Sequence, residues 1–436
     1  MKKKIVQTCI ILSVSFMFFG CNKLSDILNG HHDPKPAAAQ VALDWYKLQL
    51  RILLERNSSL NGVYFGYIGI GLYEAVRNEN KDAASFSSKL YQMPAMPSRD
   101  KSKEYDWEES ANAALAGLTR SYFTGLTPAN IVSIDSLENV YNKRSTDRNG
   151  TATFTRSQEF GRSIAKAVYN WSLTDNFNPS NAGYTPPVFP GSWVPTPPAL
   201  ANGVMPFLST ARPFLAAHVS AKASPFPIPY SEFSTSDFYK MVKKVYTVSQ
   251  SLTTEQKNIA LFFIDQGNGV GYTPAGHDMS VVIQALETTE ANLLTAAEAF
   301  AKAGIAERDA TIVCFKSKYL YNLIRPVTYI QKLIDPNWQP FIVTPPHPEY
   351  PAAHSFVTGA VMQAVTHVLG DHVKITDHTY DFRGWNPRVY NSLFKVAEEA
   401  GISRLYGGIH YVTSIDAGLS YGEDVGNRIG KLKMLE

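Results

Sequence analysis

Apolar residues recur at helical spacing along most of this 436-residue chain, and the alternation typical of strands is scarce. Residues three or four apart share one face of an α-helix, so such segments bury one side against neighbouring helices. The pattern therefore predicts an all-α fold built as an enlarged helical bundle. Helices are expected over residues 41–55, 63–77, 109–122, 157–172, 237–249, 254–264, 279–302, 306–324, 355–369, 390–405 and 414–432.

A single large domain over residues 39–436 is the simplest organisation, because no linker-like composition divides this part of the chain. Within it, residues 175–236 are dense in proline, phenylalanine and tyrosine, which argues against regular helix. Long ordered loops in compact domains usually serve a function or cover a site. We expect this irregular excursion to wall the entrance to an active site.

The first 20 residues have the pattern of a secretion signal. Lysines at positions 2–4 precede an apolar run over 5–19, and Gly20 then precedes Cys21. A cysteine directly after a small residue is similar to a bacterial lipobox, so Cys21 is expected to become a lipidated mature N-terminus. The apolar run is about 15 residues long, short of the roughly 20 that a spanning helix needs. This length disfavours an uncleaved membrane anchor.

The segment 21–38 is polar and contains two prolines, which is typical of a flexible tether. The chain is therefore expected to be an exported bacterial lipoprotein that contacts the membrane through its lipid anchor only. Asn22 is consistent with outer-membrane sorting, on the periplasmic or the surface face. Removing residues 1–20 removes three lysines and no acids, so 41 basic residues become 38 and balance the 38 acidic ones. Without net charge or a basic tract, no nucleic-acid partner is expected.

Three fragments in the C-terminal part of the chain suit one anion-binding site. They contribute Lys318 and Arg325, then His354, then Arg404 and His410. Arginine binds pairs of oxygens and keeps its charge, while lysine adds a point charge. One imidazole can attack phosphorus or ligate vanadium, and the other can donate a proton to a leaving oxygen. Such a set fits a trigonal-bipyramidal oxyanion, either a phosphoryl group in transfer or a bound vanadate.

The spacing of these residues predicts how they converge. Lys318 and Arg325 are seven apart, or two helical turns, so both are expected on one face of a helix that Pro326 ends. His354 precedes an apolar run, so the start of that helix would direct free N–H groups at the anion. Gly407 and Gly408 are expected to break the helix between the last two site residues.

The motifs KX6RP, PxxH and SRX5H, in that order, resemble the three-part signature of one superfamily. It contains type 2 phosphatidic acid phosphatases, bacterial class A acid phosphatases and vanadium-dependent haloperoxidases. The resemblance implies a helical bundle of the vanadium haloperoxidase and acid phosphatase type. It further implies that the oxyanion is held by Lys318, Arg325, the Ala353 amide and Arg404. His354 would be the general acid, and His410 the phosphorylated nucleophile or the axial ligand of vanadium.

Further segments are similar to the bacterial vanadium-haloperoxidase-like branch. They are GSWVPTPPAL at 191–200, FFIDQGNGVGYTPAGH at 262–277 and SRLYGGIH at 403–410. In that branch an acidic residue shortly before the TP motif supports the distal arginine, and Asp265 matches it here. For His277 and His347 a hydrogen-bonded loop position is favoured over a place in the pocket.

Two departures from the family pattern stand out. The usual Pro-Ser-Gly-His is replaced, since Ala352 and Ala353 precede the histidine and the serine hydroxyl is missing. Ser355 would substitute only if its rotamer allows. The acidic residue that orients the nucleophilic histidine normally follows it by four positions, whereas Asp416 follows His410 by six. Asp416 therefore either supports His410 through a longer turn or does another job.

The preferred hypothesis is a vanadate-dependent haloperoxidase that oxidises a halide with hydrogen peroxide. One alternative is a phosphomonoesterase that acts through phosphorylated His410 and needs no cofactor. Another is a surface lipoprotein that binds a ligand without catalysis. The expected partner is a small-molecule or oxyanion substrate, and the sequence leaves open the halide, the ester and the oligomeric state.

Overall fold

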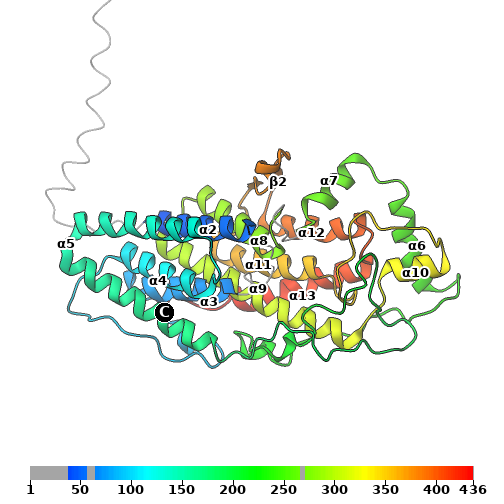
Figure 1. Ribbon diagram of the computed structural model, residues 1–436, viewed down its shortest axis with the longest axis horizontal. Coiled ribbons are helices and arrows are strands. Elements are labelled where there is room, and N and C mark those ends of the chain that lie inside the picture. The colour runs from blue at the N-terminus through cyan, green and yellow to red at the C-terminus, as the bar shows by residue number, and fades with distance from the viewer. Residues whose placement is uncertain (1–37, 56–63, 266–270, 436) are drawn as a thin grey trace, which may run out of the picture. The chain divides into compact units, whose positions relative to one another are not determined.

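The computed structural model describes residues 38–55, 64–265 and 271–435. Within these ranges the only strands are β1 (Ile375–Asp377) and β2 (Arg388–Tyr390), which pair antiparallel, and helices dominate (Figure 1). The prediction of an all-α fold is confirmed. The predicted signal segment, the lipidation site Cys21 and nearly all of the predicted tether lie outside the described residues. No helix in the described part of the chain is long and apolar enough to cross a membrane.

Residues 38–436 form one compact unit. Its α-helices, in chain order, are α2 (Gln40–Glu55), α3 (Phe65–Val76), α4 (Trp107–Tyr122), α5 (Pro128–Ser172), α6 (Asp237–Ser249), α7 (Thr254–Phe262), α8 (Pro274–Thr288), α9 (Leu293–Tyr321), α10 (Pro326–Leu333), α11 (Ala353–Leu369), α12 (Leu393–Tyr406) and α13 (Val412–Gly430).

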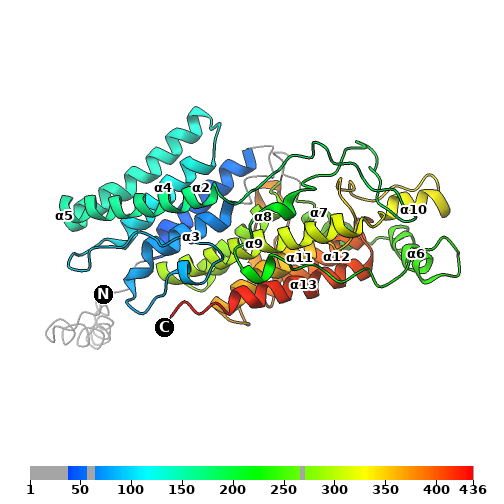
Figure 2. The same cartoon turned by 90° about the horizontal axis from the view of Figure 1, so that it is seen from below.

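Helix α9 lies in the middle of this unit, between α3 and α11 (Figure 2). It is rich in alanine and buried on almost every side, as expected of a helix without a polar face. Its three consecutive charged residues Glu307, Arg308 and Asp309 are nevertheless buried. Buried charges need partners, and Asp309 finds them in the backbone N–H groups of Phe214 and Leu215, at 2.7 and 3.0 Å. The long excursion is thereby tied to the central helix.

A stripe of glycines brings α13 against the backbone of α11. Gly418, Gly422 and Gly426 are four residues apart, so they share one face of α13. A methyl group on Gly418 would lie 2.6 Å from the carbonyl oxygen of Ala352, and one on Gly422 would overlap that of Phe356. Only glycine permits so close an approach. The two helices that begin beside His354 and His410 are therefore locked together.

Two helix predictions were wrong in their boundaries. The segment predicted as one helix over 279–302 is divided, because Glu290 has φ +49° and the Asn292 side chain caps a new helix by accepting from the Thr295 N–H. Helix α5 is broken at Gly150 (φ 73°, ψ 165°), so the helix predicted over 157–172 is its second part, and its first part, from Pro128, was not predicted. The buried face of its first part has helical spacing but is mostly polar, so hydrophobic periodicity did not reveal it; it consists of Asn130, Ile134, Glu138, Tyr141 and Ser145.

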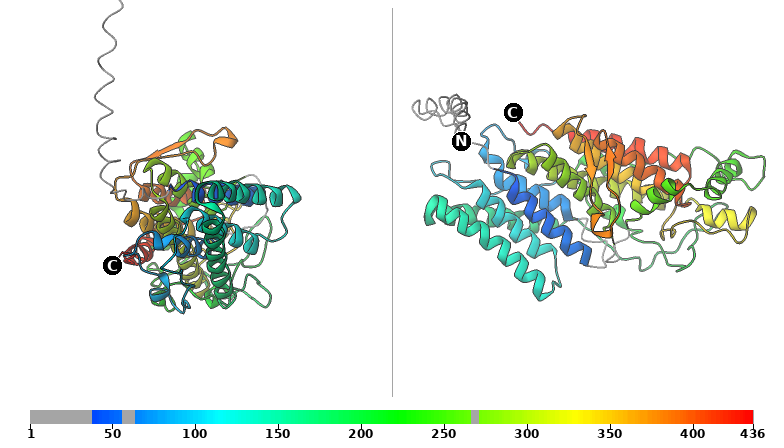
Figure 3. Two further views of the ribbon diagram at one scale, coloured as in Figure 1. Left: turned by 90° about the vertical axis from the view of Figure 1, so that its left-hand side faces the viewer. Right: turned by 90° about the horizontal axis from the view of Figure 1, so that it is seen from above.

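The helix predicted over 306–324 is the second half of α9, which begins at Leu293, and the remaining expected helices are present with boundaries shifted by a few residues. Residues 175–236 are irregular, as expected, apart from the single turns Leu208–Thr210 and Ala216–His218. The hairpin of β1 and β2, orange in the right-hand view of Figure 3, contacts α8 through β1 and α12 through β2. Through that contact Asp377, in β1, reaches the site described next.

Candidate active site

The chain turns between Lys318 and Arg325 instead of continuing as a helix. Asn322 adopts the left-handed conformation (φ 45°, ψ 43°) and ends α9, and its N–H donates to the Lys318 carbonyl at 2.8 Å. Arg325 then occupies the N-cap position of α10, whose first residue is Pro326, without a capping hydrogen bond from its side chain. The expectation that both cations share one helix face, and that Pro326 ends their helix, was wrong. Both side chains still point toward the segment 345–351, because the turn brings the chain back.

Lys318 anchors the loop that leads into α11. Its Nζ donates to the carbonyl oxygens of Pro348 at 3.0 Å, Glu349 at 2.9 Å and Pro351 at 2.5 Å. The side chain is fully buried, and this burial lowers the pKa of Lys318 to about 7. The ammonium group therefore contributes its charge from behind the loop and holds the loop in place.

Arg325 is fully buried and bridges two histidines. Its Nη1 is 3.1 Å from Nε2 of His410 and donates to the Ile409 carbonyl at 2.9 Å. Its Nη2 is 3.0 Å from Nδ1 of His347, and its Nε donates to the His347 carbonyl at 2.9 Å. Burial lowers the pKa of Arg325 to about 10, so the guanidinium stays charged at neutral pH. His347 is thus a contact of the site, contrary to the prediction.

Glu349 fixes the orientation of His410. Its Oε1 lies 2.9 Å from Nδ1 of His410 and accepts from the Tyr411 N–H at 2.8 Å, while Oε2 accepts from the Ser414 hydroxyl. Burial raises the pKa of Glu349 to about 7, but Arg325 can only donate, so Nε2 of His410 beside it keeps its lone pair and Nδ1 carries the proton that faces Glu349. Burial and the nearby Arg325 hold the pKa of His410 well below its usual value, which favours this neutral form. A neutral imidazole nitrogen can act as nucleophile or metal ligand.

The expectation that Asp416 supports His410 is corrected. Asp416 is exposed on α13, whereas the carboxylate bound to His410 comes from the loop before α11. Position 414, where the family carries its acid, holds Ser414, and its hydroxyl binds that same carboxylate. The sequence pattern predicted the orienting acid downstream of His410 only. The available signal was Glu349 itself, an acid within the PPHPEYP segment directly before the second motif.

A second histidine and arginine lie on the other side of the site. Nε2 of His354 is 3.3 Å from Oδ2 of Asp265 and 3.5 Å from Nη1 of Arg404, whose Nη2 donates to the Phe263 carbonyl. The closer carboxylate favours the tautomer with a proton on Nε2, which leaves Nδ1 as an acceptor. Burial, followed by the charge of Arg404, lowers the pKa of His354 to about 4. Burial likewise lowers the pKa of Arg404 to about 10.

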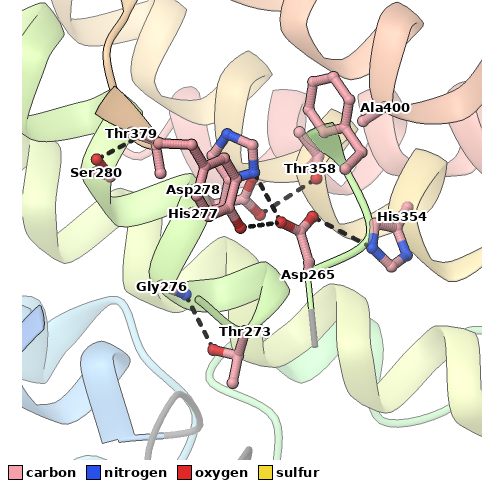
Figure 4. A network of polar contacts seen from close by, with 12 residues as sticks. Asp265, Thr273, Gly276, His277, Asp278, Ser280, His354, Thr358, Thr379 and Ala400 are labelled. Atoms are coloured by element: carbon pink, nitrogen blue, oxygen red, sulfur yellow. Dashed lines mark hydrogen bonds and ion pairs between the residues drawn. The ribbon is translucent and has the colours of Figure 1, made fainter. Parts of the chain in front are cut away.

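Behind His354 runs a chain of buried charges (Figure 4). Oδ1 of Asp265 is 2.9 Å from Nδ1 of His277. Nε2 of His277 is in turn 2.9 Å from Oδ2 of Asp377. The Tyr380 hydroxyl also donates to Asp265 at 2.7 Å. Burial alone would lower the pKa of His277, but the two carboxylates hold it well above its usual value. His277 is therefore an imidazolium, hydrogen-bonded as predicted, although it lies in α8 and not in a loop.

The missing serine hydroxyl is not replaced by its neighbour. Ala352 is fully buried, and its N–H donates to the Ser414 carbonyl at 3.1 Å. Ser355 is buried against Gly401, and its Oγ has no hydrogen-bond partner among the described residues. No side chain caps the start of α11, so its first N–H groups, beginning with that of Ala353, are available to an anion.

These groups surround a cavity of ≈ 370 Å³, hereafter the site cavity. Of the predicted residues, Asp265, Ala353, His354, Arg404 and His410 line it. Arg325 lies behind that lining, in contact with His347 and His410, which form part of it. Lys318 lies farther back, hydrogen-bonded to the loop before α11. The excursion contributes three lining residues, which are Val204, Met205 and Leu208.

Comparisons with known proteins agree with this geometry. Residues 333–434 match the family described as the VCPO second helical-bundle domain. A solved structure described as the first bacterial vanadium-dependent iodoperoxidase is 31% identical, with a TM-score of 0.83, over 93% of this chain and 98% of the other. A holo-type bacterial vanadium-dependent chloroperoxidase is 16% identical, with a TM-score of 0.62, over 85% and 90%. No curated protein sequence gives a match. The chain belongs to the vanadium haloperoxidase family, whose members are enzymes.

The residues present fit a vanadate ion. Lys318, Arg325 and Arg404 are three buried cations, and the two carboxylates nearest to the site histidines are Glu349 and Asp265. The lowered pKa values of all three cations show that burial is not fully compensated by these carboxylates. A bound oxyanion would supply the missing negative charge.

Proposed function

We propose that this protein is a vanadate-dependent haloperoxidase that oxidises a halide with hydrogen peroxide. The observation that carries the proposal is the pairing of His410 with Glu349, which leaves Nε2 unprotonated beside Arg325. The 31% identity with a bacterial iodoperoxidase supports it. The overall reaction converts peroxide, halide and one proton into hypohalous acid and water.

The residues of this chain would have two tasks, which are to balance the charge of the bound ion and to transfer a proton. Nε2 of His410 would hold the vanadium, and the first N–H groups of α11 with Lys318, Arg325 and Arg404 would balance the charge of the oxygens. When bound, vanadate supplies a redox-inert Lewis acid that activates peroxide.

His354 would handle the proton. Its pKa of about 4 makes it neutral at neutral pH, so Nδ1 can accept a proton from hydrogen peroxide and return it to the departing oxygen. Asp265 holds the ring in that tautomer.

A phosphatase acting through phosphorylated His410 is the second candidate. The observation that favours it is Ala352, because a buried methyl group stands where the family has a hydroxyl for its oxyanion. A resident vanadate would lose one hydrogen bond, worth about 1–3 kcal/mol with a charged acceptor. A phosphate that must leave in every cycle tolerates this loss better.

One paired assay separates the candidates. Purified protein, with and without vanadate, is tested for iodide and bromide oxidation and for release of phosphate from a monoester. We expect halide oxidation that requires vanadate and disappears in His410→Ala. Phosphate release by the vanadate-free protein, with a trapped phosphohistidine and no halide oxidation, would reverse the assignment.

A further inference from the structure

Met205 carries the only sulfur atom among the described residues that line the site cavity. This methionine belongs to the irregular excursion, is half-buried, and lines the same space as His354 and His410. Thioethers are readily oxidised to sulfoxides. An oxidant formed beside these two histidines therefore shares one cavity with an oxidisable side chain.

The segment that carries Met205 is held in place by hydrogen bonds on both sides. The Val204 N–H donates to the Pro346 carbonyl at 2.9 Å, and the Tyr319 hydroxyl donates to the Val204 carbonyl at 2.6 Å. The Met205 carbonyl accepts from the Leu208 N–H at 3.2 Å. Met205 itself has φ +51°, a conformation that residues other than glycine rarely adopt. These contacts fix the thioether at the wall of the cavity.

The other methionines of the described chain provide an internal comparison. Four are at most 7% exposed, namely Met93, Met279, Met362 and Met434. Met96 and Met241 are half-buried, as Met205 is, but neither lines the site cavity. An oxidant acting from bulk solution would attack the three half-buried side chains to a similar degree. An oxidant acting inside the cavity would attack Met205 first.

The thiol of Cys314 does not compete with Met205 for such an oxidant. Cys314 is the only cysteine among the described residues, is fully buried, and does not line the site cavity. Burial raises its pKa to about 11, so the group stays a protonated thiol at neutral pH. The reactive form of cysteine is the thiolate. Met205 is thus the sulfur that an oxidant from this site would reach.

We propose that Met205 is an oxidation site, at which hypohalous acid made in the site cavity converts the thioether to a sulfoxide. The inference rests on the proposed function, which supplies the oxidant. The bond between oxygen and halogen breaks, a sulfur–oxygen bond forms, and a halide ion and one proton leave. Sulfur loses two electrons, and the halogen gains them.

Oxidation of Met205 should disturb the wall of the cavity. Its side chain packs against a buried apolar cluster that consists of Leu208, Ala211, Ile312 and Phe315. A sulfoxide is polar and chiral, so it disrupts apolar packing. Halide oxidation should therefore decline with the number of turnovers completed, because each turnover makes one molecule of the oxidant.

Peptide mapping by mass spectrometry tests the place of oxidation. The full-length, vanadate-loaded protein turns over peroxide and the halide that it oxidises, with serum albumin added as a scavenger too large to enter the cavity. We expect at least about tenfold more sulfoxide at Met205 than at Met96 or Met241, since albumin intercepts only the released oxidant. Equal oxidation of the three methionines would overturn the inference. So would equal oxidation of Met205 by peroxide without halide.

A variant without this sulfur tests the consequence. Met205→Leu keeps a similar apolar volume, and Leu200 shows that leucine adopts the same backbone conformation in this excursion, with φ +50°. The readout is the fraction of the initial rate that remains after a fixed number of turnovers. This fraction should be at least about twofold higher in Met205→Leu than in wild type. Met241→Leu is the matched control and should decline as wild type does. Equal decline in both variants would contradict the proposal.

Failure of this inference can be told apart from failure of the proposed function. Measured halide oxidation with sulfoxide only at Met96 and Met241 would overturn this inference and leave the proposed function standing. A protein that oxidises no halide would overturn the proposed function, and this inference would fall with it.

Discussion

Oε1 of Glu349 and Nδ1 of His410 are 2.9 Å apart, across 61 positions of sequence. The same carboxylate also binds the Tyr411 N–H and the Ser414 hydroxyl, so it fixes the start of α13 together with the imidazole. Groups that orient a metal-ligating histidine in this way set its tautomer and its basicity. In this chain, the orientation of His410 depends on a residue that precedes the second motif.

Replacing this carboxylate should impair the site. We expect Glu349→Gln to lower halide oxidation by about 10- to 100-fold, because Nδ1 loses its charged acceptor. Steady-state kinetics with saturating vanadate measure the effect. Asp416→Asn removes the carboxylate that sequence alone suggested and should stay near wild type. A comparable loss in both variants would show that the Glu349 contact has no special role.

The buried charges behind His354 should control the acid limit of activity. Asp377 keeps His277 protonated, and His277 keeps the pKa of Asp265 below its usual range, against the effect of burial. A lowered acid pKa means that the ionised form persists to low pH and is lost as pH falls through that pKa. Asp377→Asn weakens the hold on His277 and so raises the pKa of Asp265. The acid limb of kcat/KM should then move to higher pH.

A surface pair provides the control for this pH profile. Asp381 and His378 are 2.8 Å apart, and both are about half exposed. Asp381→Asn removes a carboxylate from a histidine without touching the site, so its profile between pH 4 and 8 should match wild type. If Asp377→Asn lowers activity equally at every pH, its role is only structural.

Anion affinity should fall as pH rises above neutrality. Lys318, with its pKa lowered to about 7 by burial, is charged below that pH and mostly neutral above it. A bound anion favours the charged form, so sulfate affinity should drop by up to about tenfold per pH unit above pH 7. Sulfate serves as the probe because its own charge is constant there. Calorimetry at pH 6.5 and 8.5 provides the comparison.

Two lysine variants separate this effect from general electrostatics. Lys318→Met should bind sulfate weakly at pH 6.5 and show little further loss at pH 8.5. Lys316→Met, two residues earlier on α9 at a half-buried lysine that donates to the Val219 carbonyl and does not line the site cavity, should retain the wild-type pH dependence. Identical behaviour of these two variants would rule out Lys318 as the titrating group.

The departure at the second motif can be reversed. Ala352→Ser restores the hydroxyl that the family pattern carries, and one more hydrogen bond to a charged oxygen should tighten vanadate by about tenfold, or about 1.4 kcal/mol. Equilibrium dialysis with vanadate measures this gain. Phosphate-ester turnover should change less, since product must leave in each cycle. An unchanged vanadate affinity would show that the buried side chain at 352 cannot reach the anion.

The proposed lipid anchor has its own test. Cys21→Ser should release the protein from the membrane fraction of expressing cells, because the variant lacks the thiol to which we expect the lipid to be attached. Fractionation without detergent, followed by immunoblotting, measures this release. Retention of the variant in the membrane fraction would instead favour the uncleaved anchor.

The motifs predicted which residues form the site better than how they come together. Order and residue type identified Lys318, Arg325, His354, Arg404 and His410, since each answers a separate chemical need. Helical spacing failed for the first two because Asn322 reverses the chain in a left-handed turn, which asparagine tolerates but does not require. The sequence did not predict the contacts of Glu349 with His410 and of Asp377 with His277, because these partners lie 61 and 100 positions away. Contacts over such separations depend on tertiary packing.

The glycine stripe between α11 and α13 has a consequence for how this enzyme can diversify. Because Gly418 and Gly422 bring α13 against the backbone of α11, the helices that begin beside the two histidines cannot slide past each other without a clash, and separating them would lose this packing. The relative positions of His354 and His410 should therefore stay the same while other parts of the sequence vary. Variation in what the enzyme accepts must come from the irregular segments around 204–208 and 342–346, which line the cavity outside that pair of helices. New specificities should be sought by mutating those two segments, leaving the glycines untouched.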